Sequence, residues 1–312
     1  MRSSLRRHGR LGIAVAGLTL MAACTSGGAQ ERSGQASTAA PSSGTAVAPS
    51  PAPGTATGGL PRPDHVMVVV FENESAAKVL GSRDAPYLTS LAGTGVTFTD
   101  AHAETHPSQP NYLALFSGST QGVTDDDCLD QLSGDSLGSQ LLDAGLSFVG
   151  WSEGMPKAGY TGCESGDYAR KHNPWVNFAK LPASVNQPLS TMPADYGQLP
   201  TVSFVVPDLC NDMHDCGVAA GDAWAKKVLD PYVSWAGQHN SLLLVTFDED
   251  DGSSDNHIPT FVVGAGVQVT STDQRIDHYD MLRTLEEMYG LPPLGKAADA
   301  RTITDVWTPT GR

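Results

Sequence analysis

Basic residues are scarce in this 312-residue sequence. Lys and Arg together number 19 against 34 Asp and Glu, which gives a formal net charge of −15 at pH 7. An average field of this sign repels nucleic acids and anionic membrane surfaces, so we expect no nucleic-acid partner. If the ligand is an anion, its site must supply positive charge locally. That charge would come from a metal ion or from a few concentrated Lys, Arg and His side chains.

Long apolar runs are also lacking. The run LGIAVAGLTLMAA has 13 residues and follows the basic head MRSSLRRHGR. It is too short for a permanent membrane span, and with the small residues at its end it predicts an export signal over 1–24. Ala22, Ala23 and Cys24 resemble a bacterial lipoprotein box, although Met21 stands where Leu is more usual.

This pattern gives two expectations for the mature protein. We expect a lipid anchor at Cys24, and the alternative is a plain signal peptide with an incidental cysteine. The protein is then a cell-envelope lipoprotein on the outer face of the cytoplasmic membrane, or it is secreted. Residues 25–62 are almost all Ser, Thr, Ala, Gly, Pro and Gln. Such a segment has too little apolar surface to fold, which predicts a disordered tether.

The remaining segment, 63–312, is long enough for one large domain, because roughly 250 residues bury a substantial core. It has four cysteines, Cys128, Cys163, Cys210 and Cys216, and no C-x-x-C spacing. An even number in an exported chain predicts two disulfides rather than a thiolate metal site. Three pairings are possible. The short separation of Cys210 and Cys216 favours that pair, with Cys128 bonded to Cys163.

Apolar runs alternate with helical patterns along 63–312. Strands are expected at 65–73, 146–151, 200–207, 241–247 and 258–264, and helices at 84–95, 110–118, 134–145, 221–239 and 277–290. In the helix at 84–95, Asp84 is the expected cap. The strands are apolar on both faces, which is typical of a mostly parallel sheet covered by helices on both sides. The predicted fold is therefore a single α/β domain.

Acidic residues follow three of the predicted strands. Glu72 and Asn73 end the first strand, the segment DLCNDMHD follows the strand at 200–207, and DEDD follows the strand at 241–247. Ligands of such sheets bind beyond the carboxyl ends of the strands, so these clusters should converge on one crevice. Carboxylate and amide oxygens suit a divalent cation. The alternative for each cluster alone is a helix cap or a solvated loop.

The segment HPSQPNYLALFSG places Ser108 at the start of a predicted helix. Free N–H groups and the positive end of the dipole at a helix N-terminus favour a phosphate there. A hydroxyl in that position could attack phosphorus, with Asn111 donating an N–H to the transferred oxygens. The alternative is that Ser108 is an ordinary helix N-cap.

Several stretches together resemble a known family. They are FEN, AETHPSQPNYLALFSG, YARKHNPWVNF, LPTVSFVVPDLCNDMHD, SLLLVTFDEDDGSS and HYDMLRTLEEMYGLP, and they span nearly all of 63–312. This chain resembles the phosphoesterase branch of the alkaline phosphatase superfamily, which contains acid phosphatases and bacterial phospholipases C. It is most similar to SapM-type secreted acid phosphatases. The resemblance implies an alkaline phosphatase-like fold.

The resemblance also implies roles for individual residues. It implies one divalent metal ion (Ca, Mg, Mn, Fe or Zn) held by Glu72, Asn73, Asp248 and Glu249, with Ser108 as nucleophile and further ligand. Six other matching positions carry a catalytic or phosphate-binding expectation: His106, Asn111, Lys171, His172, Asp212 and His214. His278 falls where two-metal relatives supply a further histidine. Glu249 stands where those relatives have a histidine, and this favours a single metal ion.

The sequence therefore predicts an acid phosphatase that hydrolyses small phosphorylated substrates, including phosphoinositide lipids, through a phosphoserine. In this mechanism His214 or His172 protonates the leaving oxygen. Two alternatives are a phosphodiesterase or phospholipase C acting at the same site, and a lipoprotein that binds a metal or ligand without turnover. Structural roles are the alternatives for the histidines: His214 in the Cys210–Cys216 loop and His172 in packing beside Trp175.

Overall fold

The computed structural model describes residues 59–308 apart from residue 254. The predicted export signal, Cys24 and most of the predicted tether lie outside the described residues. Leu60 is already buried in the core, and the Arg62 carbonyl accepts a hydrogen bond from the Asn240 side chain. The packed part of the chain thus includes the residues just before the predicted boundary at 63.

The centre of the fold is an eight-stranded sheet in the order β10-β2-β9-β8-β1-β7-β3-β6. Its strands are β1 (His65–Phe71), β2 (Val96–Phe98), β3 (Phe148–Ser152), β6 (Asn186–Pro188), β7 (Val202–Val206), β8 (Ser241–Phe247), β9 (Thr260–Gly264) and β10 (Thr270–Thr272). The central strands β8, β1, β7 and β3 are parallel, and β9 runs antiparallel to β8 and β2. The mostly parallel sheet is as predicted. A separate hairpin consists of β4 (Glu164–Ser165) and β5 (Tyr168–Ala169).

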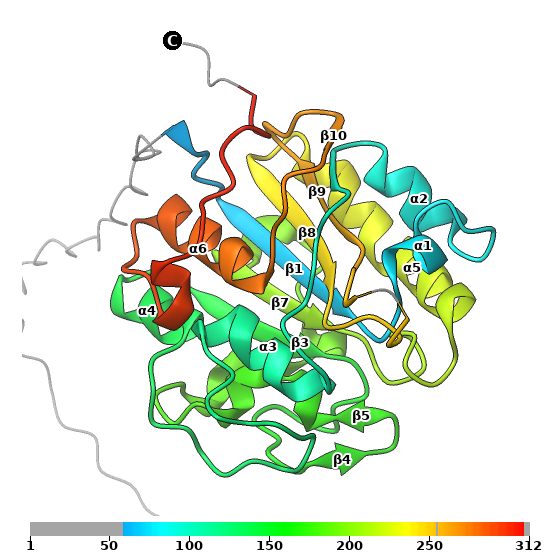
Figure 1. Ribbon diagram of the computed structural model, residues 1–312. Helices are drawn as coiled ribbons and strands as arrows, with labels where there is room; N and C mark the ends of the chain where they lie inside the picture. The colour runs from blue at the N-terminus through cyan, green and yellow to red at the C-terminus, as the bar shows by residue number, and fades with distance from the viewer. Residues whose placement is uncertain (1–58, 254, 309–312) are drawn as a thin grey trace, which may run out of the picture. The chain divides into compact units, whose positions relative to one another are not determined.

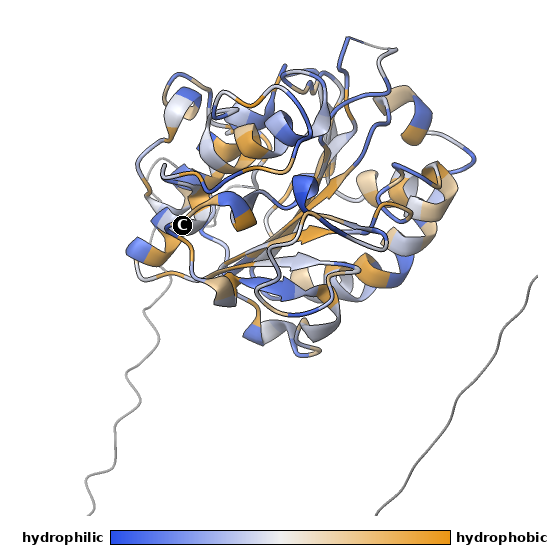
Figure 2. Ribbon diagram, turned by 90° about the horizontal axis from the view of Figure 1, so that it is seen from below, coloured by the Kyte–Doolittle hydropathy of each residue, from blue (hydrophilic) through white to orange (hydrophobic). Residues whose placement is uncertain are grey.

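Helices cover both faces of this sheet (Figure 1). They are α1 (Ala76–Val79), α2 (Pro86–Ala92), α3 (Ser108–Ser117), α4 (Leu137–Asp143), α5 (Val218–Ala236) and α6 (His278–Tyr289). On one face α3 packs against α6 and α4, and on the other α2 packs against α5. Figure 2 shows the apolar strands as a band between helices, as expected for strands buried on both faces.

The helix boundaries differ from the predicted ones in two informative places. Asp84 is not the cap of α2, because the helix begins at Pro86 and Ala85 is the N-cap. The helix predicted from Pro110 begins two residues earlier, so Ser108 lies in its first turn and Pro107 is the N-cap. Proline in the first turn is compatible with a helix, since the N–H that it lacks has no partner inside the helix there. The α6 boundaries agree closely with prediction, with Asp277 as the capping residue and Gly290 left-handed at the end.

Several short elements escaped prediction, among them α1, β2, β6, β10 and the β4–β5 hairpin. Each of these helices and strands has only two to four residues, which is too few for a periodic pattern to be recognised. They lie at the margins of the sheet or outside it. Their omission does not affect the placement of the central strands, which position the candidate site.

Both disulfides have the favoured pairing. Cys128 is bonded to Cys163, and Cys210 is bonded to Cys216. The first links the segment after α3 to the β4–β5 hairpin, and the second closes the short loop after β7. Within the described part of the chain no helix has the length and apolarity needed to cross a membrane.

Candidate active site

Three carboxylates lie together at the carboxyl ends of three adjacent strands. Glu72 follows β1, Asp212 follows β7 and Asp248 follows β8, and all three side chains are buried. Burial raises the pKa of Glu72 well above its ordinary value, and the facing carboxylates of Asp248 and Asp212 raise it further. The predicted convergence of acidic residues at the carboxyl ends of the strands is therefore present.

Ser108 faces this acidic cluster from the N-terminus of α3. It is 2 % exposed, and its Oγ donates to Glu72 Oε2 at 3.0 Å and lies 3.5 Å from Glu249 Oε1. Its side chain caps nothing, because the N-cap of α3 is Pro107 and makes no side-chain bond. The ordinary capping role for Ser108 is thus not what the structure shows. The hydroxyl is aimed at carboxylates that lie beyond the helix.

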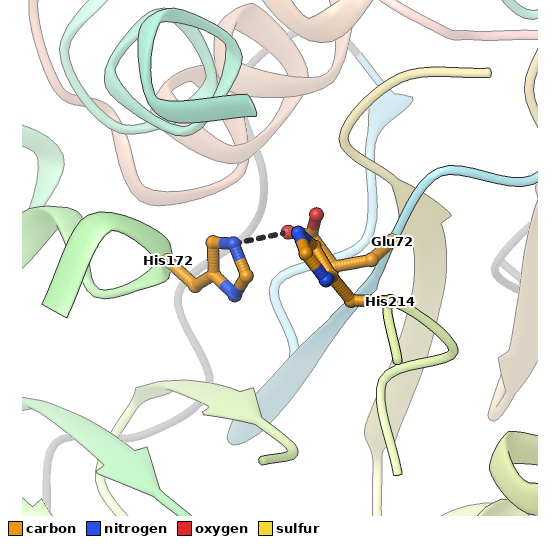
Figure 3. Close-up of side chains that lie close together, drawn as sticks. All are labelled: Glu72, His172 and His214. Carbon is orange, nitrogen blue, oxygen red and sulfur yellow. Dashed lines mark ion pairs between the residues drawn. The ribbon is translucent and has the colours of Figure 1, made fainter. Parts of the chain in front are cut away.

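His172 bridges two of the carboxylates from the other side. Its Nε2 lies 3.2 Å from Glu72 Oε1 and its Nδ1 lies 3.2 Å from Asp212 Oδ2. Figure 3 shows its ring directed at Glu72, with His214 beside that carboxylate. Burial lowers the pKa of His172 to about 3, and the charge of Lys171 contributes in the same direction. The ring is therefore held neutral between its acidic neighbours.

Lys171 and His214 form a more accessible part of the same cluster. Lys171 Nζ donates to Asp126 Oδ2 at 2.9 Å and lies 3.4 Å from His214 Nε2. His214 Nδ1 pairs with Asp215 at 2.7 Å. Burial works to lower the pKa of Lys171, but the hydrogen bond and charge of Asp126 outweigh burial and raise it. This side of the site therefore holds the positive charge that an anion requires.

Glu249 and Asp250 lie under His106. His106 Nδ1 is 3.0 Å from Glu249 Oε2, and its Nε2 is 3.4 Å from Asp250 Oδ1. The His106 side chain is 46 % exposed, so it lies at the mouth of the site rather than in its interior. Burial raises the pKa of Glu249 to about 8, and the nearby charges of Asp248 and Asp126 raise it as well.

The two predicted asparagines make different contacts, Asn111 through its side-chain amide and Asn73 through its backbone N–H. Asn111 Nδ2 donates to the carbonyls of Thr105 at 2.8 Å and Pro107 at 3.2 Å, and lies 3.4 Å from Glu249 Oε2. Its amide therefore fixes the segment that precedes the nucleophile. Asn73 has a left-handed φ of 53°, and its N–H donates to Asp248 Oδ1 at 3.1 Å. That bond ties the end of β1 to the end of β8.

His278 lies next to the cluster without joining it. It is 1 % exposed; its Nδ1 lies 2.6 Å from Glu104 Oε2 and its Nε2 lies 2.9 Å from the Phe247 carbonyl. Burial acts to lower its pKa, but the Glu104 carboxylate outweighs burial and raises it to about 9. An imidazolium here connects the segment before Ser108 with the residue before Asp248. Of the predicted site residues, His278 alone has no recorded contact with the others in the described part of the chain.

The donor atoms present fit a divalent cation. Oδ2 of Asp212 and of Asp248 are buried and accept no hydrogen bond of good geometry among the described residues. Ligand atoms of Glu72, His172 and His214 all lie within 4.8 Å of one another (Figure 3). Several buried carboxylates of one sign repel each other unless a cation or protons neutralise them. The cluster is therefore a possible metal site, and this grouping contains two histidines and, of the predicted oxygen ligands, Glu72 alone.

Sequence reasoning missed three side chains that contact the site. Tyr112 donates to Glu72 Oε1 at 2.5 Å and stacks on His172, while Asp126 and Glu104 contact Lys171 and His278. Tyr112 had a usable signal, because it is four residues after Ser108 and so shares its helix face. The other two are carboxylates in loops, where no periodic pattern distinguishes a contact from a solvated charge.

Solved structures with the same architecture identify the fold. The chain aligns with a protein of the alkaline phosphatase superfamily from Vibrio parahaemolyticus, with a TM-score of 0.54, 14% identity, and coverage of 78% of this chain and 70% of that chain. It aligns equally with a phosphonate monoester hydrolase from Silicibacter pomeroyi, with a TM-score of 0.54, 12% identity, and coverage of 80% and 78%. The fold is therefore that of the alkaline phosphatase superfamily.

Sequence comparison narrows this class to a family. A model described as the Phosphoesterase family matches residues 73–292. The chain is 50% identical over 251 residues to a phosphatidylinositol-3-phosphatase of Mycobacterium tuberculosis, covering 80% of this chain and 84% of that protein. It is 35% identical over 228 residues to a phosphate-repressible acid phosphatase of Penicillium chrysogenum, covering 67% of this chain and 55% of that protein. The chain belongs to the phosphoesterase family and is a hydrolase of phosphoric esters.

Proposed function

We propose that this protein is an acid phosphatase that hydrolyses phosphomonoesters through a phosphoserine at Ser108. The observation that carries this proposal is the orientation of the Ser108 hydroxyl. It lies in the first turn of α3, makes no cap, and donates to Glu72 at 3.0 Å. A phosphoryl group bound next to this hydroxyl would lie at the N-terminus of the helix, where free N–H groups stabilise its negative charge.

In the first step Ser108 Oγ attacks phosphorus, and the bond from phosphorus to the leaving oxygen breaks. Glu72 Oε2 already accepts the hydroxyl hydrogen, so it orients the nucleophile and is placed to receive its proton. Tyr112 and His172 hold the Glu72 carboxylate from two sides. The Asn111 side chain holds the 104–107 segment by hydrogen bonds, and this fixes the position of Ser108, which follows that segment.

The leaving oxygen must gain a proton, and His214 is better placed to give it than His172. The His172 side chain is 2 % exposed and lies between Glu72 and Asp212. The His214 side chain is 29 % exposed and lies beside Lys171. Lys171 supplies charge to the phosphoryl oxygens. Water then attacks the phosphoserine, the P–Oγ bond breaks and phosphate leaves. A histidine that must begin protonated favours acidic pH.

A divalent cation fits this site, and the predicted ligands Glu72, Asn73, Asp248, Glu249 and Ser108 would hold it. When bound, it would neutralise phosphoryl charge and favour the ionised form of the Ser108 hydroxyl. Oxygen ligands suit Ca, Mg or Mn, while His172 or His214 in the ligand set would favour Zn or Fe.

The proposed substrate class is supported by the names of the relatives, and the proposed location is supported by the sequence of residues 1–24. The Mycobacterium tuberculosis relative is named for phosphatidylinositol 3-phosphate, and the fungal relatives are named as acid phosphatases. We extend to this chain the hydrolysis of small phosphomonoesters, including phosphoinositides. Export through the 1–24 segment, with lipid attachment at Cys24, would place the enzyme at the outer face of the cell envelope.

The test is hydrolysis of an aryl phosphate by the purified protein between pH 4 and pH 8, beside Ser108→Ala. We expect an acidic optimum and a loss of about a thousandfold or more in kcat for the variant, because the nucleophile is gone. A chelator should lower activity, and added divalent ions should restore it. Unchanged hydrolysis by Ser108→Ala would exclude the phosphoserine pathway. Release of diacylglycerol from a phospholipid, with no phosphate from monoesters, would favour the phospholipase C reading instead.

A further inference from the structure

One of the two disulfides encloses two residues of the candidate active site. Cys210 is bonded to Cys216, and the short loop between them contains Asp212 and His214. Ligand atoms of His214 and Glu72 lie within 4.8 Å of each other (Figure 3). The disulfide therefore closes a ring of chain that carries part of the site.

The first half of this loop is held by buried contacts that do not involve the disulfide. The Asp212 carbonyl accepts the Glu72 N–H at 2.9 Å, and the Asp212 carboxylate accepts the His214 N–H at 2.9 Å. Met213 is 2 % exposed and lies close against Gly221 of α5, where a Cβ atom would be 2.5 Å from the Met213 side chain. Asp212 is thus fixed by the end of β1 and by the core.

The second half of the loop is less firmly held. Residues 214–216 lie at the surface. The His214 ring contacts Asp215 Oδ1 at 2.7 Å and Lys171 Nζ at 3.4 Å, and the Asp215 side chain is 54 % exposed. The Asp215 N–H donates to the Leu209 carbonyl at 2.8 Å. Exposed polar contacts stabilise a conformation only weakly, so the position of the His214 ring depends on what else restrains this half.

The turn between the two halves has a strained backbone. Met213 has a φ of 88°, in the left-handed region that a residue with a long side chain rarely adopts. Such a conformation persists where the surrounding structure holds it. The Cys210–Cys216 bond limits the ways in which this turn can relax. Because His214 follows Met213 directly, relaxation of the turn would move the His214 ring.

We propose that the Cys210–Cys216 disulfide is a positioning element of the active site, which holds His214 where it can protonate the leaving oxygen. The disulfide does not touch the substrate and acts through His214. This inference rests on the proposed phosphomonoesterase function, because it concerns the proton donor of that reaction. When the bond is open, Ser108 and Glu72 stay in place, but proton transfer to the leaving oxygen becomes less efficient.

The first test compares kcat for an aryl phosphate with kcat for an alkyl phosphate. A nitrophenolate leaves with little help from an acid, whereas an alkoxide needs a proton. We expect Cys210→Ser/Cys216→Ser to lower kcat about tenfold or more for the alkyl phosphate and about threefold or less for the aryl phosphate. The control is Cys128→Ser/Cys163→Ser, which opens a disulfide with no candidate site residue between its cysteines. The control should keep the parental ratio of the two kcat values, although opening the longer loop should cost more stability.

The second test asks whether the disulfide acts through His214. In a His214→Gln chain, removal of the disulfide should cause no further change in the ratio of the two kcat values. Addition of a dithiol to the folded parent enzyme repeats this test without cysteine variants. The dithiol is oxidised to its own disulfide, and its two hydrogen atoms pass to the sulfurs of Cys210 and Cys216. Thiol alkylation followed by mass measurement confirms that the bond is open. The aryl-to-alkyl ratio should rise about threefold or more in the parent and stay constant in His214→Gln.

The outcomes separate this inference from the proposed function. An unchanged ratio in folded protein with the bond open would overturn the positioning role. An equal change in His214→Gln or in the Cys128→Ser/Cys163→Ser control would overturn it as well, because the effect would then not pass through His214. In each of these cases hydrolysis would still depend on Ser108. The proposed function fails by a different result, which is hydrolysis that survives in Ser108→Ala.

Discussion

At the scale of single residues, the site depends on side chains that hold other side chains. Asp126 shows this most clearly, because one carboxylate accepts from the backbone of Gln109 and from the ammonium of Lys171. Burial works to raise the pKa of Asp126, but these two bonds and the charge of Lys171 outweigh it and lower the pKa. The carboxylate is therefore ionised across the range in which the enzyme would act.

Replacing Asp126 with Asn tests this positioning role. The amide keeps the size of the side chain but removes the charge that fixes Lys171. We expect KM for an aryl phosphate to rise about three- to tenfold, with a smaller change in kcat, because ground-state anchoring of the phosphate is weakened. Steady-state kinetics measure this split. Asp135→Asn, which removes the partner of Lys180 at a distant surface pair, is the control. A fall in kcat with constant KM would contradict the prediction.

His278 offers a second prediction at this scale. His278→Ala breaks a buried pair with Glu104 and leaves an uncompensated carboxylate. We expect a loss of about 3–5 kcal/mol in unfolding free energy and about a 10- to 100-fold lower kcat. Urea unfolding and kinetics give the two values. Glu104→Gln should reproduce part of both effects, because the imidazole then lacks its counter-ion. Wild-type kcat in a folded His278→Ala protein would mean that His278 has a structural role alone.

At the scale of elements, the parallel strands bring the chemistry together and loops complete it. Strands β1, β7 and β8 were predicted from apolar runs, and their order in the sheet places Glu72, Asp212 and Asp248 at one edge. The loop at 125–129 and the β4–β5 hairpin have no such pattern. Their position comes from the Cys128–Cys163 disulfide and the Arg170 bonds.

Removal of that disulfide should therefore lower the unfolding free energy of the protein. The two cysteines are 35 residues apart, and the loss of this link by Cys128→Ser/Cys163→Ser should cost about 3–4 kcal/mol on the chain-entropy model. Cys210→Ser/Cys216→Ser opens a separation of only 6 residues and should cost about 1.5 kcal/mol less. Denaturant unfolding compares them. A larger cost for the shorter loop would contradict the entropic ordering.

At the scale of the whole molecule, several buried groups take up protons on folding. Burial raises the pKa of Asp212 to about 7, of Glu249 to about 8 and of Glu286 to about 7, from ordinary values of 3.8, 4.5 and 4.5. At His278, burial is outweighed by Glu104 and the pKa rises from 6.5 to about 9. Each folded pKa lies above the unfolded value. The stability contributed is thus fully present below the unfolded pKa and is lost as pH rises through the folded one.

We therefore expect the chelated protein to be less stable at pH 9 than at pH 5. His172 opposes this trend below pH 6.5, because burial lowers its pKa to about 3, but it is one group against four. Between pH 5 and pH 9 the Tm of the chelated protein should fall by about 5–10 °C, measured by calorimetry. Glu286→Gln removes one proton-binding group outside the metal cluster. The Tm of this variant should therefore fall less between pH 5 and pH 8 than the Tm of the parent protein. A bound cation should also weaken the dependence of Tm on pH, because it replaces protons at the site carboxylates. A Tm that rises with pH would contradict this account.

The sequence by itself determined the chemistry and the core of the fold. The apolar runs of β1, β7 and β8 specify buried parallel strands, and the acidic residues after them must then meet at the strand ends. The Ser-Gln-Pro-Asn stretch specifies a serine at the start of a helix. These features are local to the sequence or common to every parallel sheet, so they could be predicted from the sequence, whereas the order of the strands comes from the structure.

Only the tertiary structure decided which groups are in contact. His278, His172 and His214 all stand next to polar residues in the sequence, yet the structure places them differently. His278 has no direct contact with the cluster, His172 is buried between two carboxylates, and His214 lines a cavity. The structure also added Asp126 and Glu104, whose partners are 45 and 174 residues away. Contacts across such separations depend on how loops close over the sheet. No periodicity along the chain encodes that closure.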